Sequence, residues 1–255
     1  MKILVCVKRV PLTGGRMVLT ADEQAIETRH LGFTISPHEE CGVEEAVRIV
    51  ENHGGEVVVL TLGPAEAEEQ LRDALAVGGD RAIHLVTDGE EWDPQTTATA
   101  IVEAIRADEA ASGPFDLVVH GNESADTGNY QVAIRVAHAL GRPVATGLKG
   151  LSVDGGSVRC EQEVGGGRDV YVLPLPAVVT VKEGLNLPRF PSVPGRLRAQ
   201  RKPVASSSPA RGEARLVRQR LVVPEGERKQ AEVLGHGPEA APRVVEELGT
   251  IGVLT

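Results

Sequence analysis

The chain has 255 residues, enough for one large domain or for one domain with a small appendage. Hydrophobic residues at 41% and charged residues at 25% are ordinary for a globular protein with net charge −9, and no apolar stretch approaches the roughly eighteen residues of a membrane span. Aromatic residues make up only 2%, which argues against the stacking platforms that bind single-stranded nucleic acid. The three cysteines are odd in number and form no CxxC pair, so we expect a reducing, cytoplasmic environment.

Four short apolar runs alternate with segments of helical periodicity in the first 140 residues. The strands are expected at 2–7, 56–62, 81–86 and 116–120, with helices after residues 36, 63, 93 and 131. Ser36 and Glu39 have the spacing of a capping box, and Pro37 suits the first helical turn. The strands do not alternate in polarity, which indicates burial on both faces. We therefore predict an α/β fold with an open, mostly parallel, Rossmann-like sheet and helices on both faces.

The pattern changes after Pro143. Strands joined by glycine-rich turns are expected at 147–154, 157–164 and 169–174, which predicts a small antiparallel excursion. Residues 177–182 return to the main sheet as a buried strand. The chain beyond 203 is polar, with one last helix expected at 241–248, so we expect an extended C-terminal arm that lies on another surface.

Three segments are expected to meet at the carboxyl edge of this sheet, where open α/β folds bind ligands. They are the end of the first strand at 6–8, the helix start at 36–39, and the loop 121–131. The loop leads into a helix N-terminus, where free amides favour an anion, and Thr127 and Asn129 can donate to phosphate oxygens. Asp126 can bind a hydroxyl or cap the helix. The alternative is that this loop caps a helix and does nothing more.

No catalytic set accompanies this nucleotide site. The sequence has no GxxxxGK[ST] or GxSxG motif, and the GxGxxA match at 235–240 lies too near the end of the chain for a βαβ unit. His84 and His120 are expected to be ordinary residues near strand ends. Lys8 and Arg9 either contact phosphate or form an exposed basic pair. The sequence thus predicts a nucleotide pocket without a reaction.

Apolar side chains are interspersed with prolines after the last sheet strand. The prolines stand at 188, 191 and 194, and the apolar residues are Leu185, Leu187, Phe190 and Val193. Because proline fixes φ and lacks a donor, we expect neither helix nor central strand here. The apolar side chains either wait for a partner protein or pack under the chain's own arm.

The stretch that follows is strongly basic. From 195 to 220 there are eight basic residues against Glu213 alone, so this stretch carries +7 and the remainder −16. A basic strip on an acidic body suits nucleic acid or an acidic partner protein. Because no aromatic platform accompanies it, we expect no nucleic-acid binding.

Three stretches together resemble the β subunit of electron transfer flavoprotein. They are VCVKRV at residue 5, SADTGNYQVAIRVAHALGRP at 124, and LPAVVTVKEGLNLPRFPSVPGRLRAQRK at 175. The resemblance spans roughly residues 1–203, and the tail beyond matches only in character.

The resemblance implies a heterodimer whose α subunit holds most of an FAD, while this subunit binds a structural AMP. By position, the AMP pocket comprises Cys6, Ser36, Pro37, His38, Glu39, Leu62, Gly121, Asn122, Asp126, Thr127, Gly128, Asn129, Gln131 and Val132. Tyr130 stands where family members have glycine, and His38 where some have an aromatic residue near the flavin. The implied domains are an AMP-binding domain at 1–202 and an arm at 203–255 that wraps the α subunit.

The family's recognition loop corresponds to residues 181–203. Its implied contacts with partners are Leu185, Leu187, Phe190, Val193, Arg196 and Arg198, with Val193 at the tip. The implied partners are acyl-CoA and related dehydrogenases and electron transfer flavoprotein:quinone oxidoreductase, with no direct membrane insertion. The resemblance implies an electron carrier and not an enzyme.

Two alternatives remain open from the residues. One is a bifurcating family member with a second FAD in the AMP site. The other is an adenine-nucleotide-using α/β enzyme, although KRVPLTGG after the first strand lacks the serine and aspartate of an SGGxDS loop.

Overall fold

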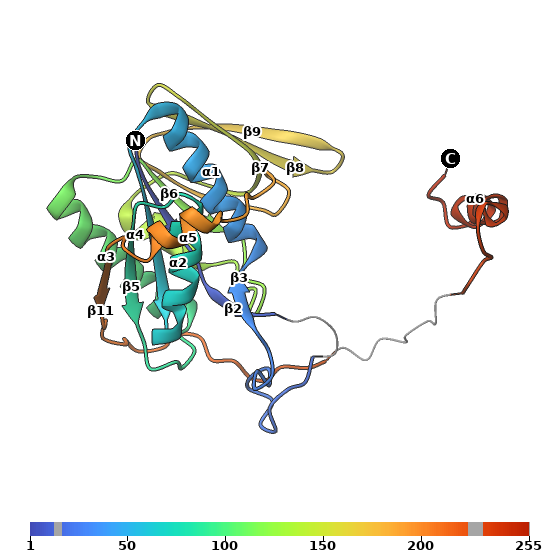
Figure 1. Ribbon diagram of the computed structural model, residues 1–255, viewed down its shortest axis with the longest axis horizontal. Helices are drawn as coiled ribbons and strands as arrows, with labels where there is room; N and C mark the ends of the chain where they lie inside the picture. Colours follow the sequence, from blue (N-terminus) through green and yellow to red (C-terminus); the bar gives the residue numbers. More distant parts are fainter. Residues whose placement is uncertain (13–16, 224–231, 255) are drawn as a thin grey trace. The chain divides into compact units, whose positions relative to one another are not determined.

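The computed structural model describes residues 1–12, 17–223 and 232–254, which fall into two compact units, Met1–Arg220 and Leu221–Thr255. The first unit is built on a nine-stranded sheet of order β11-β5-β4-β1-β6-β10-β7-β8-β9 (Figure 1). Its pairs are parallel from β11 to β7 and antiparallel from β7 to β9. The strands are β1 Lys2–Cys6, β4 Glu56–Gly63, β5 Arg81–Val86, β6 Leu117–Gly121, β7 Val144–Asp154, β8 Ser157–Val164, β9 Gly167–Pro174, β10 Ala177–Val181 and β11 Val204–Ser207. The predicted fold class is confirmed.

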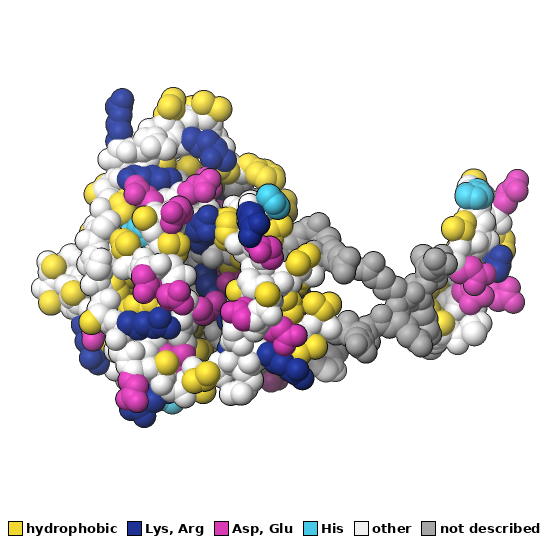
Figure 2. All heavy atoms as spheres, turned by 90° about the horizontal axis from the view of Figure 1, so that it is seen from below, with side chains coloured by type: hydrophobic (Ala, Val, Ile, Leu, Met, Phe, Trp, Pro, Cys, Tyr) yellow, Lys and Arg dark blue, Asp and Glu magenta, His cyan; other side chains and the backbone are white. Residues whose placement is uncertain are grey.

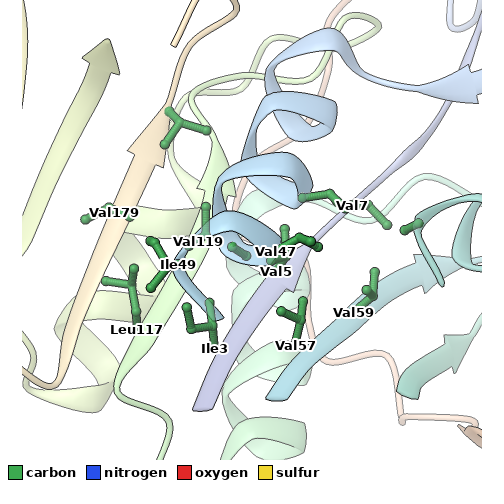
Figure 3. Close-up of a cluster of buried hydrophobic side chains, with 14 of the residues drawn as sticks. Ile3, Val5, Val7, Val47, Ile49, Val57, Val59, Leu117, Val119 and Val179 are labelled. Atoms are coloured by element: carbon green, nitrogen blue, oxygen red, sulfur yellow. The ribbon is translucent and has the colours of Figure 1, made fainter. Parts of the chain in front are cut away.

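The central strands are buried on both faces, as their unbroken apolar runs predict. One face packs against α1 (Pro37–His53) and α2 (Glu68–Val77), and the other against α3 (Pro94–Ser112) and α4 (Val132–Leu140). Figure 3 shows the first of these cores, in which side chains of β1, β4, β6 and β10 meet Val47 and Ile49 of α1. Gly42 allows α1 to approach β6 closely, since a Cβ added there would lie 3.2 Å from the side chain of Val119.

The antiparallel excursion is confirmed as β7, β8 and β9, which form the far end of the sheet (Figure 1). A second, two-stranded antiparallel sheet pairs β2 (Arg9–Pro11) with β3 (Phe33–Ile35) and was not predicted. The Arg9 guanidinium lies 3.3 Å from the centroid of the Phe33 ring. This short sheet holds the chain that connects β1 to α1.

The prediction of no helix in the proline-rich segment is wrong for its last part. Residues 182–192 are irregular, but α5 runs over Val193–Ala199. Ser192 caps this helix, because its Oγ accepts a hydrogen bond of 3.1 Å from the Gly195 amide. Pro194 is tolerated because it lies in the first turn, where no backbone donor is required.

The first unit extends further than the sequence boundary at 202. β11 pairs in parallel with β5, and the Asp93 carboxylate accepts hydrogen bonds from the amides of Arg215 and Leu216. The second unit contains η2 (Pro238–Ala240) and α6 (Ala241–Thr250), so the predicted last helix is confirmed. None of the helices in the described ranges is long and apolar enough to cross a membrane.

Candidate functional site

The three predicted segments do meet at the carboxyl edge of the sheet, where the second and third of them line a cavity of about 420 Å³ and the first contacts both through Lys8. Residues 36–38 at the start of α1 and residues 123–128 after β6 form most of its wall. Glu183, which follows β10, completes it. Glu183 was not predicted as a residue of this site. It could have been, because β10 is a strand of the same parallel sheet and its carboxyl end therefore reaches this edge.

The start of α1 differs from the predicted capping box. Ser36 has the extended conformation of an N-cap, but its side chain makes no capping hydrogen bond. Glu39 accepts a hydrogen bond of 2.6 Å from the backbone N–H of Lys8, just beyond the end of β1, and the backbone N–H of Ser36 also acts on its carboxylate as a donor. The carboxylate therefore joins α1 to β1, and the predicted box is wrong only in its Ser36 side-chain half.

Burial dominates the ionisation of groups beneath the cavity. It raises the pKa of Glu39 to about 8, although the Lys8 amide and charge act in the opposite direction. Burial, followed by the nearby Glu39 carboxyl, also raises the pKa of the Cys6 thiol. Cys6 is thus a neutral, buried thiol at physiological pH and not a nucleophile.

Lys8 connects the first strand to the loop after β6. Its Nζ lies 2.7 Å from the Asp126 carboxylate, 3.3 Å from Thr127 Oγ1 and 3.4 Å from Glu91. Burial opposes the charge of Asp126, yet the charge and hydrogen bond of Lys8 outweigh it and lower the pKa of Asp126. Of the two basic residues left open by the sequence, Lys8 thus contacts Asp126 and Thr127 of the cavity wall, and Arg9 stacks on Phe33.

The loop after β6 is held by its own short hydrogen bonds. The Ser124 and Thr127 hydroxyls lie 3.0 Å apart, and Asp126 accepts a bond of 2.8 Å from the Thr127 amide. Gly128 and Tyr130 have φ values of 54° and 56°, so the tyrosine at the usual glycine position adopts the left-handed conformation. Gln131 then begins α4 without a side-chain cap, which leaves the first amides of that helix available to an anion.

The other predicted pocket residues lie around this wall. Gly121 ends β6, and an added Cβ there would lie 2.6 Å from Glu39 Cγ. Asn122 accepts a hydrogen bond of 2.8 Å from Thr180. Leu62 of β4 packs against the core on the α3 and α4 face. Of the residues predicted for the AMP pocket, eight do not line the cavity: Cys6, Glu39, Leu62, Gly121, Asn122, Asn129, Gln131 and Val132.

Histidines near this edge are neutral or engaged in structure. Burial lowers the pKa of His120 to about 4 and also lowers the pKa of His38. His84 Nε2 lies 3.1 Å from the Pro64 carbonyl oxygen. His38 lines the cavity, and its buried Nδ1 has no partner in the described part of the chain.

A second candidate site is the segment of residues 182–199, here called the docking segment. Its side chains Leu187, Phe190 and Val193 are 84%, 95% and 73% exposed. Leu197 of α5, which the sequence analysis did not single out, is also exposed. Leu185 differs from the prediction, because it packs against the chain's own core.

Charges of the basic stretch are partly paired within the first unit. Arg196 lies 2.9 Å from Asp73, and Arg218 lies 3.4 Å from Glu91, whereas Arg198 and Arg201 are exposed. On the face seen in Figure 2, acidic and basic side chains are interspersed with small groups of hydrophobic ones. The basic stretch therefore places positive charge near the docking segment. Part of that positive charge is balanced by acidic side chains of the first unit.

The fold and the site together define an open α/β protein with a polar-lined cavity at the carboxyl edge of its sheet. The sequence model of the electron transfer flavoprotein domain matches residues 25–211. The chain is 34% identical over 206 residues to electron transfer flavoprotein subunit beta of Bacillus subtilis, covering 80% of this chain and 77% of that protein. It is 34% identical over 217 residues to the subunit beta of Syntrophomonas wolfei, covering 85% and 83%. It is 33% identical over 210 residues to the mitochondrial subunit beta of Oryza sativa, covering 82% of each.

These similarities show that the chain belongs to the electron transfer flavoprotein family and resembles its β subunits over most of its length. The resemblance found in the three quoted stretches is therefore confirmed.

Proposed function

We propose that this chain is the β subunit of a heterodimeric electron transfer flavoprotein and that it carries electrons without catalysing a reaction of its own. FAD, held mainly by the α subunit, takes up and releases the electrons. The electrons come from dehydrogenases such as acyl-CoA dehydrogenases and pass through electron transfer flavoprotein:quinone oxidoreductase to the respiratory chain. Membership of the family supports this role.

The observation that carries the proposal is the exposure of Leu187 and Phe190 on the irregular part of the docking segment and of Val193 at the start of α5. Exposed apolar side chains grouped on a surface mark interaction sites. Burying each such side chain in a partner's pocket contributes about 1.5–3 kcal/mol, which suits a weak, reversible anchor for a dehydrogenase. Exposed Arg198 and Arg201 beside the anchor then speed association with an acidic partner surface.

The cavity suits AMP in a structural role. Thr127 in the cavity wall offers a hydroxyl donor to a phosphate, and Lys8 offsets the charge of Asp126. A volume of about 420 Å³ lies at the low end of the roughly 300–1,000 Å³ range of ligand pockets. This size favours a mononucleotide over a second FAD.

The arm is proposed to wrap the α subunit. In the second unit, Val244 and Val245 of α6 and Ile251 after it are exposed apolar residues, and the described part of that unit has no buried core.

The three cysteines are buried and unpaired, which suits the cytoplasm.

Co-expression with the α subunit tests the carrier role. The purified complex is expected to be yellow and to be reduced by an acyl-CoA dehydrogenase in the presence of its substrate. A colourless complex, or a flavin that no dehydrogenase reduces, contradicts the proposal.

The nucleotide is tested by denaturing the complex and separating what it releases. AMP in a 1:1 ratio with FAD is expected. Two FAD molecules and no AMP point instead to the bifurcating alternative, and steady ATP turnover by the complex points to an enzyme.

A further inference from the structure

We propose that Arg189 is a positioning residue: together with Glu44 and Glu51 of α1 it forms a clamp that fixes the docking segment in its binding shape before a partner arrives. The inference deepens the proposed function and rests on it. It concerns how the apolar side chains are presented, which the prolines alone do not decide.

The clamp is made by one guanidinium and two carboxylates. Arg189 Nε and Nη2 donate to Glu44 over 2.8 and 3.1 Å, and Nη1 and Nη2 donate to Glu51 over 2.7 and 3.0 Å. The backbone amide of Arg189 also donates to Glu44, over 3.1 Å. Planar, bidentate pairs of this kind fix orientation as well as distance.

Glu44 is a buried anchor and not a surface partner. Its side chain is only 3% exposed, and its oxygens accept from Arg48 as well as from Arg189. Burial opposes its charge, but the hydrogen bonds from Arg189 and Arg48 outweigh that effect and lower the pKa of Glu44. The carboxylate is therefore ionised at neutral pH, and the clamp is closed.

A second attachment fixes the chain before Leu187. Asn186 Nδ2 donates to the Cys41 carbonyl over 3.0 Å and to the Glu45 carboxylate over 2.9 Å. Arg48 donates to the carbonyl of Leu187 over 3.4 Å. All of these contacts come from α1, so a single helix holds the segment on both sides of Leu187.

The attachments use the polar side chains and leave the apolar ones free. Leu187 and Phe190 alternate with Asn186 and Arg189 and are 84% and 95% exposed. Proline fixes φ of Pro188 but does not fix the place of the segment relative to the body. The clamp supplies that placement, so little conformational entropy remains to be lost on docking.

The test uses the purified flavin-containing heterodimer with Arg189→Ala and Arg189→Lys. Arg81→Ala is the matched control, because Arg81 also bridges two carboxylates, Asp108 and Glu56, through the Nε and Nη atoms of its guanidinium. Arg81 begins β5 at the amino edge of the sheet, away from the docking segment. Flavin content and thermal unfolding are measured for every variant.

For Arg189→Ala we expect the KM of the dehydrogenase for the flavoprotein to rise about tenfold with kcat and flavin content unchanged, because only the preorganised docking shape is lost. Arg189→Lys keeps the charge without the fork, and its KM is expected between the two. Arg81→Ala leaves KM unchanged.

Hydrogen exchange of the backbone amides in residues 186–190, measured without any dehydrogenase, tests the clamp independently of the proposed electron-carrier function. Faster exchange in Arg189→Ala than in the unsubstituted complex is expected, and unchanged exchange or an unchanged KM overturns the clamp. An unsubstituted complex that no dehydrogenase reduces contradicts the proposed function itself.

Discussion

The loop of residues 121–131 and the docking segment, which ends in the short helix α5, leave neighbouring strands, β6 and β10, at the same edge of the sheet. The first turns hydroxyls and carboxylates toward a cavity. The second turns apolar side chains toward water. Two adjacent strands thus end in segments with opposite surfaces.

The difference lies in what holds each segment. The first is held mainly by its own residues, since Ser124, Asp126 and Asn129 all bond to Thr127, with Lys8 as an outside contact. The docking segment is held largely from outside, by α1 around Arg189 and by α2 along α5. A loop whose polar groups hydrogen-bond to one another can form the wall of a small-molecule cavity. A segment that neighbouring helices hold in place can leave its apolar side chains exposed for contact with another protein.

The largest effect is expected from Gly121→Ala, which removes the close approach of β6 to α1. The new Cβ meets Glu39 Cγ at 2.6 Å, and overpacking of this kind costs about 1–3 kcal/mol. We expect the nucleotide to be lost from the purified complex while docking changes little. Gly156→Ala, where nothing lies within 4 Å of the added Cβ, is the control. Full nucleotide content in Gly121→Ala would show that the cavity wall tolerates the shift.

Val193→Ala tests the opposite surface. Losing two buried methyl groups weakens docking by about 1.5 kcal/mol, so KM for the dehydrogenase rises about tenfold while nucleotide content stays the same. The control is Val172→Ala on β9, an equally simple change at a valine that is 64% exposed. Equal kinetics for both variants count against Val193 as an anchor.

Lys8→Met removes the outside contact of the nucleotide loop. Asp126 then loses its cationic partner beside the proposed phosphate position, and we expect nucleotide affinity to fall about fivefold, as for loss of roughly 1 kcal/mol of charge-assisted bonding. Equilibrium dialysis of nucleotide measures this. Lys2→Met is matched, since Lys2 lies 2.7 Å from Asp108 at the other end of β1. Similar losses in both variants would indicate general destabilisation.

The smallest effect concerns Glu39, whose folded-state pKa of about 8 exceeds its ordinary value of 4.5. The folded chain therefore binds more protons than the unfolded chain between these values, and the free energy of unfolding falls as pH rises. Between pH 7 and 8, above the window from about 4 to 6.5 in which His120 contributes, we expect a loss of about 1 kcal/mol. Urea unfolding at these two pH values should show the loss in the unsubstituted protein.

Glu39→Gln tests the origin of that slope. An amide at this position can still accept the Lys8 hydrogen bond but does not titrate, so the slope should flatten in this window. A slope that persists in Glu39→Gln assigns the pH dependence to other groups.

The central strands and their helices could be predicted because their apolar runs record burial on both faces. The meeting of three segments at the cavity followed from the parallel sheet. In contrast, β11 is short and polar, and α5 contains Pro194 in its first turn. Hydrophobic periodicity therefore predicted neither element. The Glu44–Arg189 pair could not be inferred from one sequence, because its members lie 145 positions apart and look like ordinary surface charges.

One consequence follows from the seventeen residues of α1. Its first turn forms a wall of the cavity, and its middle turns fasten the docking segment. Tightly packed helices move as units, because close-packed interiors resist local deformation. If the proposed function holds, a substitution that tilts this helix is therefore expected to alter nucleotide retention and dehydrogenase docking together.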